Sequence, residues 1–352
     1  MPVLDLLNKD QYIDELIHKI KHLTAKDHLI ILTMSLDFRA GRGKQLFQAI
    51  KAALNSKVNV IILLDANNFM YQPGLKFGPL FYRHKNTSLL KNSSFYRLKD
   101  DLLQLENLGA KIKLLNHPTK LFSSPFKGRN HIKLTVINNI CYFGGFNLVD
   151  NLSIDSMMRV KDDNLSNFLF DFTQRLYLKG SVKFCFPEDI QKKFDNYELL
   201  IDKGEKKQSI IFDRAIKNIN DASYRIILTC QFFPDSRLIE ALNQAYLKGV
   251  KVQIIYNSPN KHDFPFNIVH GLLVVYMRYV KKISSELFNN QIKDKKFLHD
   301  KILITDDRVI YGSHNFVYAG LKYGTSELAI ESQDKFSVGV VMNFIKSFCN
   351  LI

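Results

Sequence analysis

Two short stretches of the sequence place a histidine two residues before a lysine, at the start of an apolar run. His131 precedes Lys133, and His299 precedes Lys301. Because residues i and i+2 of a strand project from the same face, we expect each imidazole beside its ammonium group. A nucleophilic or proton-transferring imidazole next to a cation is suited to reactions at an anionic phosphorus centre.

Further residues follow each pair at matching distances. Gly144 and Gly312 lie thirteen residues after their histidines, and Asn147 and Asn315 lie sixteen residues after them. A single H-x-K pair carries little weight, because a histidine before an apolar strand is more often structural. Four types of residue repeated at one offset of 299 − 131 = 168 predict a duplicated functional site.

The two sets, brought together at an interface, would surround one phosphate group. The lysines and asparagines would contact its non-bridging oxygens and offset charge that develops in the transition state. One imidazole would attack phosphorus to give a covalent phosphohistidine. The other would protonate the leaving oxygen and then activate the incoming alcohol or water. Histidine suits both roles because its ordinary pKa lies near working pH.

A longer internal repeat supplies the elements that would position these sets. The segment IILT at 30–33 recurs at 226–229, and the apolar pattern of 46–65 recurs at 238–256 with an offset of 192. Apolar residues at helical spacing, followed by a buried-strand pattern, predict a strand–helix–strand unit in each copy. Such a unit is typical of a parallel sheet covered on both faces.

The segment between each lysine and the following glycine indicates a hairpin. The pairs Asn138–Asn139 and Asp306–Asp307 are turn formers flanked by β-branched residues. We therefore expect an α/β fold of two similar α-β-α sandwich halves related by a pseudo-twofold axis. The predicted halves are 1–195 and 205–352, joined by the polar stretch around 196–209.

The paired pattern resembles the phospholipase D superfamily, whose signature is H-x-K-x4-D followed by G-[GS]-x-N. The second copy matches throughout, with Asp306, Gly312 and Ser313 in the expected places, whereas the first has Asn138 instead of the aspartate. In that family the motif aspartate is mainly a structural hydrogen-bonding residue. Asparagine keeps one acceptor and adds a donor, so we expect the turn to survive. The resemblance covers nearly the whole chain and implies a phospholipase D-like fold.

The resemblance also implies a carboxylate for each histidine. In that family an acidic residue downstream of each motif orients the histidine of the opposite half. Glu327 is thus the expected partner of His131, and Asp155 is the expected partner of His299. A carboxylate bonded to one ring nitrogen would fix the tautomer and stabilise the imidazolium. The family favours His131 as the nucleophile.

The charge balance points to a polyanionic partner. The 352-residue chain has a formal net charge of +15, which is suited to nucleic acid, an anionic membrane surface or a phosphate-bearing substrate. Segment 67–99 interleaves aromatic and basic residues. This mixture is compatible with a membrane interface, with a single nucleic-acid strand, or with packing on its own domain. Segment 264–282 is apolar and then basic, and we expect a core helix there rather than a second binding surface.

Cysteine usage and hydropathy favour a cytoplasmic protein, with peripheral attachment to a membrane left open. Four well-separated cysteines, Cys141, Cys185, Cys230 and Cys349, form no C-x-x-C pair and are expected to be free thiols. The N-terminal stretch has acidic residues where a signal peptide needs an apolar core. The longest apolar run, 271–277, is far shorter than the ~20 residues of a membrane span.

Two details favour a lipid substrate. The GGFN of the first motif and CQFFPD at 230–235 resemble bacterial cardiolipin-synthase-like members of the superfamily. Those members use phosphatidylglycerol or a related anionic lipid and pass a phosphatidyl group to an alcohol. The resemblance therefore implies a phosphodiesterase or phosphatidyltransferase that acts on anionic phospholipid through a phosphohistidine.

Two alternatives remain open at this stage. A metal-independent nuclease or nucleic-acid phosphodiesterase would equally explain the net charge of +15. An inactive phosphate-binding module is the third reading, supported only by Asn138. We expect neither a metal nor another cofactor, because no His/Asp/Glu cluster has ligand spacing and two lysines would repel a cation. No obligate protein partner is evident.

Overall fold

The computed structural model describes residues 3–39, 41–66, 94–116, 128–149, 152–262, 266–289, 291–292, 296–317 and 322–351. Most of segment 67–99, one of the two surfaces considered above, lies outside these ranges.

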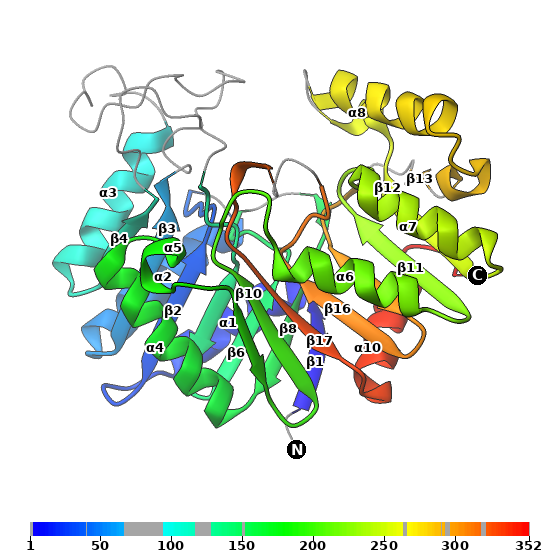
Figure 1. Cartoon of the computed structure of the whole chain (residues 1–352). Helices are drawn as coiled ribbons and strands as arrows, with labels where there is room; N and C mark the ends of the chain where they lie inside the picture. The colour runs from blue at the N-terminus through cyan, green and yellow to red at the C-terminus, as the bar shows by residue number, and fades with distance from the viewer. Residues whose placement is uncertain are drawn as a thin grey trace.

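The first sheet has seven strands in the order β1-β8-β6-β5-β2-β3-β4 (Figure 1). These strands are β1 (Val3–Asn8), β2 (His28–Thr33), β3 (Asn59–Asp65), β4 (Lys111–Leu115), β5 (Leu134–Ile137), β6 (Ile140–Gly144) and β8 (Ser156–Lys161). Strands β2, β3 and β4 are mutually parallel, and the other pairs are antiparallel.

The second sheet has eight strands in the order β13-β12-β11-β15-β16-β17-β10-β9. They are β9 (Ile190–Lys193), β10 (Tyr197–Asp202), β11 (Arg225–Cys230), β12 (Lys251–Asn257), β13 (Gln291–Ile292), β15 (Ile302–Thr305), β16 (Arg308–Gly312) and β17 (Glu327–Ser332). From β13 to β10 this order repeats that of the first sheet from β4 to β1. Strand β9 falls inside the predicted half 1–195 but pairs with β10.

Both predicted strand–helix–strand units are confirmed. Helix α2 (Gly41–Asn55) joins β2 to β3, and α7 (Ser236–Leu247) joins β11 to β12. In each unit the two strands are parallel. The expectation of a parallel sheet is too simple, because the hairpins β5–β6 and β15–β16 add antiparallel strands and make both sheets mixed.

Side-chain caps fix the starts of several helices. Helix α1 (Lys9–Lys21) begins with a capping box, in which Asn8 Oδ1 accepts from the Gln11 N–H and the Gln11 side chain accepts from the Asn8 N–H. Helix α4 (Asp163–Lys179) is capped by Asp162 and ends at Gly180, whose φ of 77° is in the left-handed region. Helix α6 (Ile210–Asp221) is capped by Ser209.

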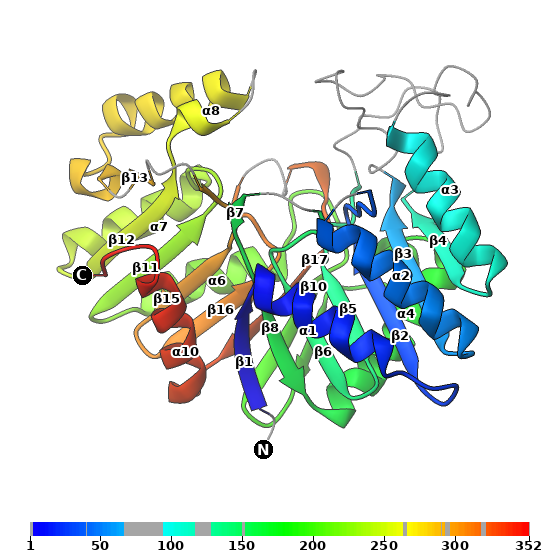
Figure 2. The same ribbon diagram turned by 180° about the vertical axis from the view of Figure 1, so that it is seen from behind.

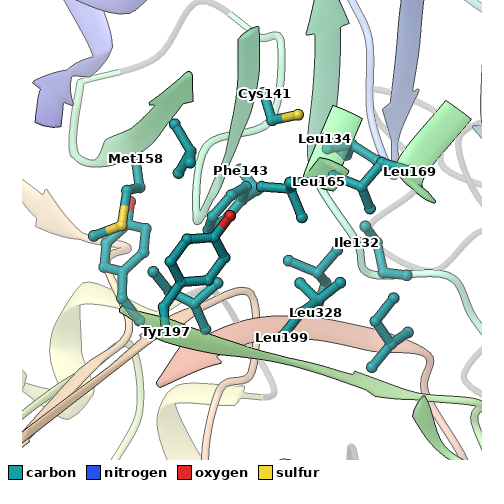
Figure 3. Packing of buried hydrophobic residues seen from close by; sticks show 14 of the residues in the cluster. Ile132, Leu134, Cys141, Phe143, Met158, Leu165, Leu169, Tyr197, Leu199 and Leu328 are labelled. Atoms are coloured by element: carbon teal, nitrogen blue, oxygen red, sulfur yellow. The ribbon is translucent and has the colours of Figure 1, made fainter. Parts of the chain in front are cut away.

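The sheets and helices form alternating layers. One core contains residues of both sheets, together with α4 and α10 (Lys335–Lys346). Figure 3 shows Leu199 and Leu328 of the second sheet beside Ile132 and Phe143 of the first half. On the outer faces, α1, α2 and α3 (Ser94–Asn107) cover the first sheet, and α6 and α7 cover the second (Figure 2). The two sets that carry chemistry therefore reach a shared interior.

The predicted hairpin turns are present in both halves. Asn138 and Asp306 both adopt the left-handed region, with φ values of 50° and 52°. The Asp306 carboxylate accepts from the backbone N–H groups of 223–225 at 2.7–3.0 Å. Asn138 Oδ1 accepts from the His28 N–H at 3.1 Å, while its Nδ2 donates to Asp27 at 2.8 Å. The asparagine therefore keeps the turn, as expected.

The prediction of a core helix at 264–282 is wrong. Helix α8 (Phe266–Val275) continues into a π-helical turn, η4 (Tyr276–Val280), and buries only a narrow face that includes His270 and Met277. Large apolar side chains on its other faces are exposed. An apolar composition does not reveal whether neighbouring elements cover a helix, and here they cover one side. Within the described ranges, every helix is too short or too polar to cross a lipid bilayer.

Candidate active site

Short β-ladders between the two halves hold each histidine segment next to the opposite half. Asn130 forms a parallel bridge with Ser326, and the His131 N–H donates to the Ser326 carbonyl at 2.9 Å. In the equivalent arrangement, β14 (Phe297–Leu298) pairs in parallel with β7 (Ser153–Ile154). The His299 N–H donates to the Ile154 carbonyl at 2.9 Å. Each histidine thus enters beside the segment of the opposite half that carries a carboxylate.

Each histidine contacts that carboxylate. His131 Nδ1 donates to Glu327 Oε2 at 3.0 Å and also lies 3.0 Å from the carbonyl oxygen of Ser313. His299 Nδ1 donates to Asp155 Oδ2 at 2.8 Å. Only 4% of the Glu327 side chain and 1% of the Asp155 side chain are exposed. Since Nδ1 is bonded in both rings, Nε2 is the nitrogen that remains to contact a substrate.

The two lysines are buried next to the histidines. Lys133 Nζ donates to the His131 carbonyl at 2.6 Å, and Lys301 Nζ donates to the His299 carbonyl. Each residue is 1% exposed. Burial lowers the pKa of both ammonium groups, with Glu327 opposing the shift at Lys133 and Asp155 opposing it at Lys301. Because burial disfavours both ammonium groups, an anion bound between them would stabilise their charged forms.

The same surroundings keep the imidazoles neutral. Burial, followed by the charges of Lys133 and Lys301, places the pKa of His131 well below its usual value. The pKa of His299 is also lowered, first by burial and then by Lys301, while Asp155 opposes the shift. At neutral pH the free Nε2 of His131 consequently has its lone pair available, which is the form a nucleophile requires.

The two repeated asparagines are alike in the two halves, but the residues that follow Gly144 and Gly312 differ. The side-chain oxygens of Asn147 and Asn315 are buried and accept no hydrogen bond from the described residues. Ser313 Oγ donates to Glu327, whereas the equivalent Gly145 lies against Asp155. A Cβ added at Gly145 would lie 2.5 Å from Asp155 Oδ1, so this close approach requires glycine.

Sequence reasoning missed Asp65, which holds the segment before His131. Asp65 ends β3 and is fully buried. Its Oδ2 accepts from the Asn130 N–H at 2.6 Å and from Asn116 Nδ2 at 2.9 Å. Arg129 Nη1 donates to Oδ1 of the same carboxylate at 3.1 Å. Asp65 therefore connects the end of a rigid strand to the two residues that precede the histidine.

Asn257 does the same in the second half. It ends β12, 192 residues after Asp65, which is the offset of the repeated unit. Asn257 Oδ1 accepts from the Leu298 N–H at 2.8 Å, and its Nδ2 donates to the Leu298 carbonyl at 2.7 Å. Leu298 immediately precedes His299. The register of the repeat places the two residues at equivalent positions, but only their hydrogen bonds show that they support the histidine segments.

Truncating these two residues is expected to have unequal effects on stability. Asp65→Ala should lower the free energy of unfolding by about 3–5 kcal/mol, because buried Arg129 loses the counter-charge that Asp65 provides. Asn257→Ala should lower it by about 1–3 kcal/mol, since it leaves backbone groups without partners but no charge. Urea unfolding of both variants measures the two decreases in the free energy of unfolding. A smaller decrease for Asp65→Ala than for Asn257→Ala would contradict this account.

Asp300 is a second residue that sequence reasoning missed. It lies between His299 and Lys301 and is fully buried. Ser156 Oγ donates to Asp300 Oδ2 at 2.7 Å, and the Tyr311 hydroxyl lies 2.9 Å from the same Oγ. Burial and the neighbouring Asp155 raise the pKa of Asp300 to about 8. The raised pKa favours the neutral form of Asp300 in this buried position.

Comparison with known proteins assigns the chain to a family. The family described as "Cardiolipin synthase, PLD-like domain" matches residues 16–166 and 215–352, which make up most of the sequence. The chain belongs to this phospholipase D-like family. Each matched stretch contains one H-x-K pair, one of the two repeated asparagines, Asn147 or Asn315, and one histidine-bonded carboxylate.

Individual relatives are similar over part of their length. The cardiolipin synthase of Oceanobacillus iheyensis is 28% identical over 249 residues, which cover 65% of this chain and 48% of that protein. The major cardiolipin synthase of Bacillus subtilis is 27% identical over 198 residues, or 51% of this chain and 40% of that protein. The chain therefore spans about half the length of the curated relatives it matches.

Solved structures share the fold at low sequence identity. Phosphatidylserine synthase of Haemophilus influenzae has a TM-score of 0.74 at 11% identity, over 99% of this chain and 87% of that one. Polyphosphate kinase of Porphyromonas gingivalis has a TM-score of 0.57 at 13% identity, over 98% of this chain and 50% of that one. These similarities confirm the predicted phospholipase D-like α/β fold.

Proposed function

We propose that this phospholipase D-like chain is a phosphodiesterase or phosphatidyltransferase that acts on anionic phospholipid through a covalent phosphohistidine. The observation that carries the proposal is the pair of histidine–carboxylate contacts made across the two halves, each with a buried lysine beside it. The curated relatives are cardiolipin synthases, and the structural neighbour with the higher TM-score reported above is a phosphatidylserine synthase. Both names are those of enzymes that form phospholipids, which supports a phosphatidyl group as the group transferred.

The first step forms the covalent intermediate. His131 Nε2 attacks phosphorus, a nitrogen–phosphorus bond forms, and the bond to the leaving oxygen breaks. His299, protonated at Nε2, gives that proton to the leaving oxygen. The Nδ1 proton stays on His131 and is donated in a hydrogen bond to Glu327, and Asp155 stabilises the His299 imidazolium. The bound anionic phosphodiester raises the pKa of His299 and opposes the lowering caused by burial and Lys301.

The second step releases the phosphatidyl group. His299 takes a proton from an alcohol or water, whose oxygen attacks phosphorus while the bond to His131 breaks. Lys133 and Lys301 contact the non-bridging oxygens and offset their charge in both steps. The side-chain amides of Asn147 and Asn315 donate to the same oxygens. An alcohol acceptor gives transfer, and water gives hydrolysis.

Product analysis tests the proposal directly. Purified protein is incubated with phosphatidylglycerol vesicles, and lipids are identified by mass spectrometry, with His131→Ala as control. We expect cardiolipin or phosphatidic acid only with the intact histidine, and their ratio separates transfer from hydrolysis. Absence of lipid turnover together with cleavage of single-stranded DNA or RNA would replace the proposal by the nuclease alternative.

The pH dependence of turnover reports the state of His131. His131 must be neutral to attack, and its lowered pKa means that this form persists below the ordinary histidine range. We therefore expect the acid limb of the kcat/KM profile to lie below pH 6.5, the usual value for histidine. An acid limb at or above that pH would contradict a neutral His131 in the free protein.

Chelation separates this chemistry from metal-assisted hydrolysis. Within the described part of the chain, no group of three or more His, Cys, Asp or Glu side chains is placed to hold a metal ion. The proposed steps use only imidazole, ammonium and amide groups, so turnover should be unchanged after dialysis against EDTA. Complete loss of turnover that a divalent ion restores would refute the mechanism.

The division of the chain and its location belong to the same proposal. We keep 1–195 and 205–352 as the two halves that contribute one H-x-K pair each. The proposed location is the cytoplasm, at the surface of an anionic membrane that supplies the substrate.

A further inference from the structure

A continuous apolar face is exposed along α8 and η4. Seven large side chains of this segment, here called the α8 face, are 43–70% exposed. They are Ile268, Val269, Leu272, Val275, Tyr276, Tyr279 and Val280. Each member has another member three or four residues away along the chain, so they form one stripe along the helix. Exposed apolar patches of this kind are uncommon on soluble proteins and indicate an interaction surface.

The α8 face is connected to the active site through packed rings. His270, on the buried side of α8, lies 4.7 Å from His262 between ring centroids, and His262 lies 5.4 Å from Phe297. Phe297 is in β14, two residues before His299. Both views show α8 at the upper edge of the molecule, and Figure 2 shows β7, the strand before Asp155, in the upper half near the middle.

The charges around the α8 face are those an anionic surface would attract. Arg278, Lys281 and Lys282 are exposed at its C-terminal end, and Lys281 pairs with Glu240 of α7 at 3.0 Å, so Arg278 and Lys282 are the cations on which the argument rests. No Asp or Glu occurs in the sequence between 264 and 285, and the whole chain carries +15. Tyr276 and Tyr279 add rings with polar tips, a type of side chain enriched at the level of lipid headgroups. An amphipathic helix with basic residues and no capacity to span lies in the plane of a bilayer.

We propose that the α8 face docks onto an anionic lipid bilayer. Docking through this face turns the upper half of the molecule in Figure 2, which includes β7 and its partner strand β14, toward the lipid, so that a headgroup reaches the histidines without leaving the surface. The inference rests on the proposed function for the identity of the substrate, but the binding itself requires no catalysis. It is tested without reference to turnover.

A single tryptophan reports insertion, because the chain has no native one. Val275→Trp places the probe on the α8 face, and Phe336→Trp places it on α10, toward the opposite end of the molecule (Figures 1 and 2). These two positions are 52% and 63% exposed, so neither substitution disturbs the core. With phosphatidylglycerol–phosphatidylcholine vesicles, we expect a blue shift and quenching by brominated lipid only for Val275→Trp. Equal responses at both positions, or none at Val275→Trp, would overturn the proposal.

Vesicle sedimentation measures the energetics of docking. Leu272→Glu is expected to weaken binding about tenfold or more, since it removes apolar area and adds a repelled charge. Arg278→Gln and Lys282→Gln should each weaken binding to anionic vesicles about fivefold and leave the weak binding to neutral vesicles unchanged. Phe336→Glu on α10 is the matched control and should bind like the wild type.

Turnover of two substrate forms separates this proposal from the proposed function. Leu272→Glu should retain wild-type turnover of short-chain phosphatidylglycerol dispersed as monomers, and lose turnover of vesicles. If the proposed function fails, neither form is turned over, yet the sedimentation result still stands. If Leu272→Glu binds vesicles normally but changes the mass measured by light scattering, the α8 face is an interface between copies and the proposal is wrong.

Discussion

His131→Asn is expected to reduce turnover by about 10⁴-fold or more, because it removes the nitrogen that we propose as the nucleophile at phosphorus. Asparagine is small enough to fit and keeps an N–H that can donate to Glu327. The buried carboxylate therefore retains a donor, and folding should be preserved. Initial rates with phosphatidylglycerol vesicles measure the loss, and thermal unfolding establishes that the variant is folded.

His299→Asn provides the matched comparison for this prediction. It removes the proton donor and acceptor but leaves the nucleophile, so the covalent intermediate should form slowly and hardly break down. A lipid labelled with ³²P in its phosphate should therefore label His299→Asn, in a bond that is stable to base and labile to acid. Label on His131→Asn would show that His299 is the nucleophile and reverse the two roles.

Lys301→Met is expected to lower kcat/KM by about 10³-fold and to leave the free energy of unfolding unchanged or raised. The loss of activity follows from the proposed role of Lys301, which is to offset the negative charge of the phosphoryl oxygens from a buried position. The stability argument follows from the pKa of Lys301, which burial lowers in the folded protein. A lowered lysine pKa means that folding disfavours the charged form, so replacing it by an apolar chain of similar size removes a cost.

Lys133→Met is the equivalent change in the first half, and Lys301→Arg is the control for charge alone. Lys133 has its pKa lowered for the same reason, so the two methionine variants should behave alike. Arginine keeps the charge but presents a planar fork that does not fit beside the His299 carbonyl, and activity should remain low. Kinetics and urea unfolding measure each variant. A loss of several kcal/mol in either methionine variant would mean that the lysines serve mainly as buried ion-pair partners.

The proposed mechanism depends on an asymmetry between two otherwise repeated sets. Ser313 donates to Glu327, whereas Gly145 offers nothing to Asp155. Asp300 lies between His299 and Lys301, whereas the equivalent position in the first half is Ile132. Burial raises the pKa of Glu327, and burial together with Asp155 raises the pKa of Asp300 to about 8. The lowering of the pKa is also unequal, because it is larger at His131 than at His299, which fits the proposed roles of neutral nucleophile for His131 and proton donor for His299 once the phosphodiester is bound.

Local sequence patterns determined much of this molecule. Two hairpins, two strand–helix–strand units and the repeat that relates them follow from turn residues and from apolar spacing, which encode the faces that must be buried. The candidate catalytic residues could also be picked out from the sequence, because His131, Lys133 and Asn147 recur as His299, Lys301 and Asn315 at one offset. The carboxylate partners, Glu327 and Asp155, came from family resemblance and not from spacing.

The tertiary structure decided the contacts between residues far apart in the chain. Ladders between the halves align His131 with Glu327, 196 residues away, and His299 with Asp155, 144 residues away. Buried supports such as Asp65 have no local signal, because a carboxylate at a strand end is indistinguishable from a solvated one until its partners are known. The exposure of α8 was likewise hidden, since apolar spacing reports which side chains avoid water but not whether a neighbouring element or another surface covers them.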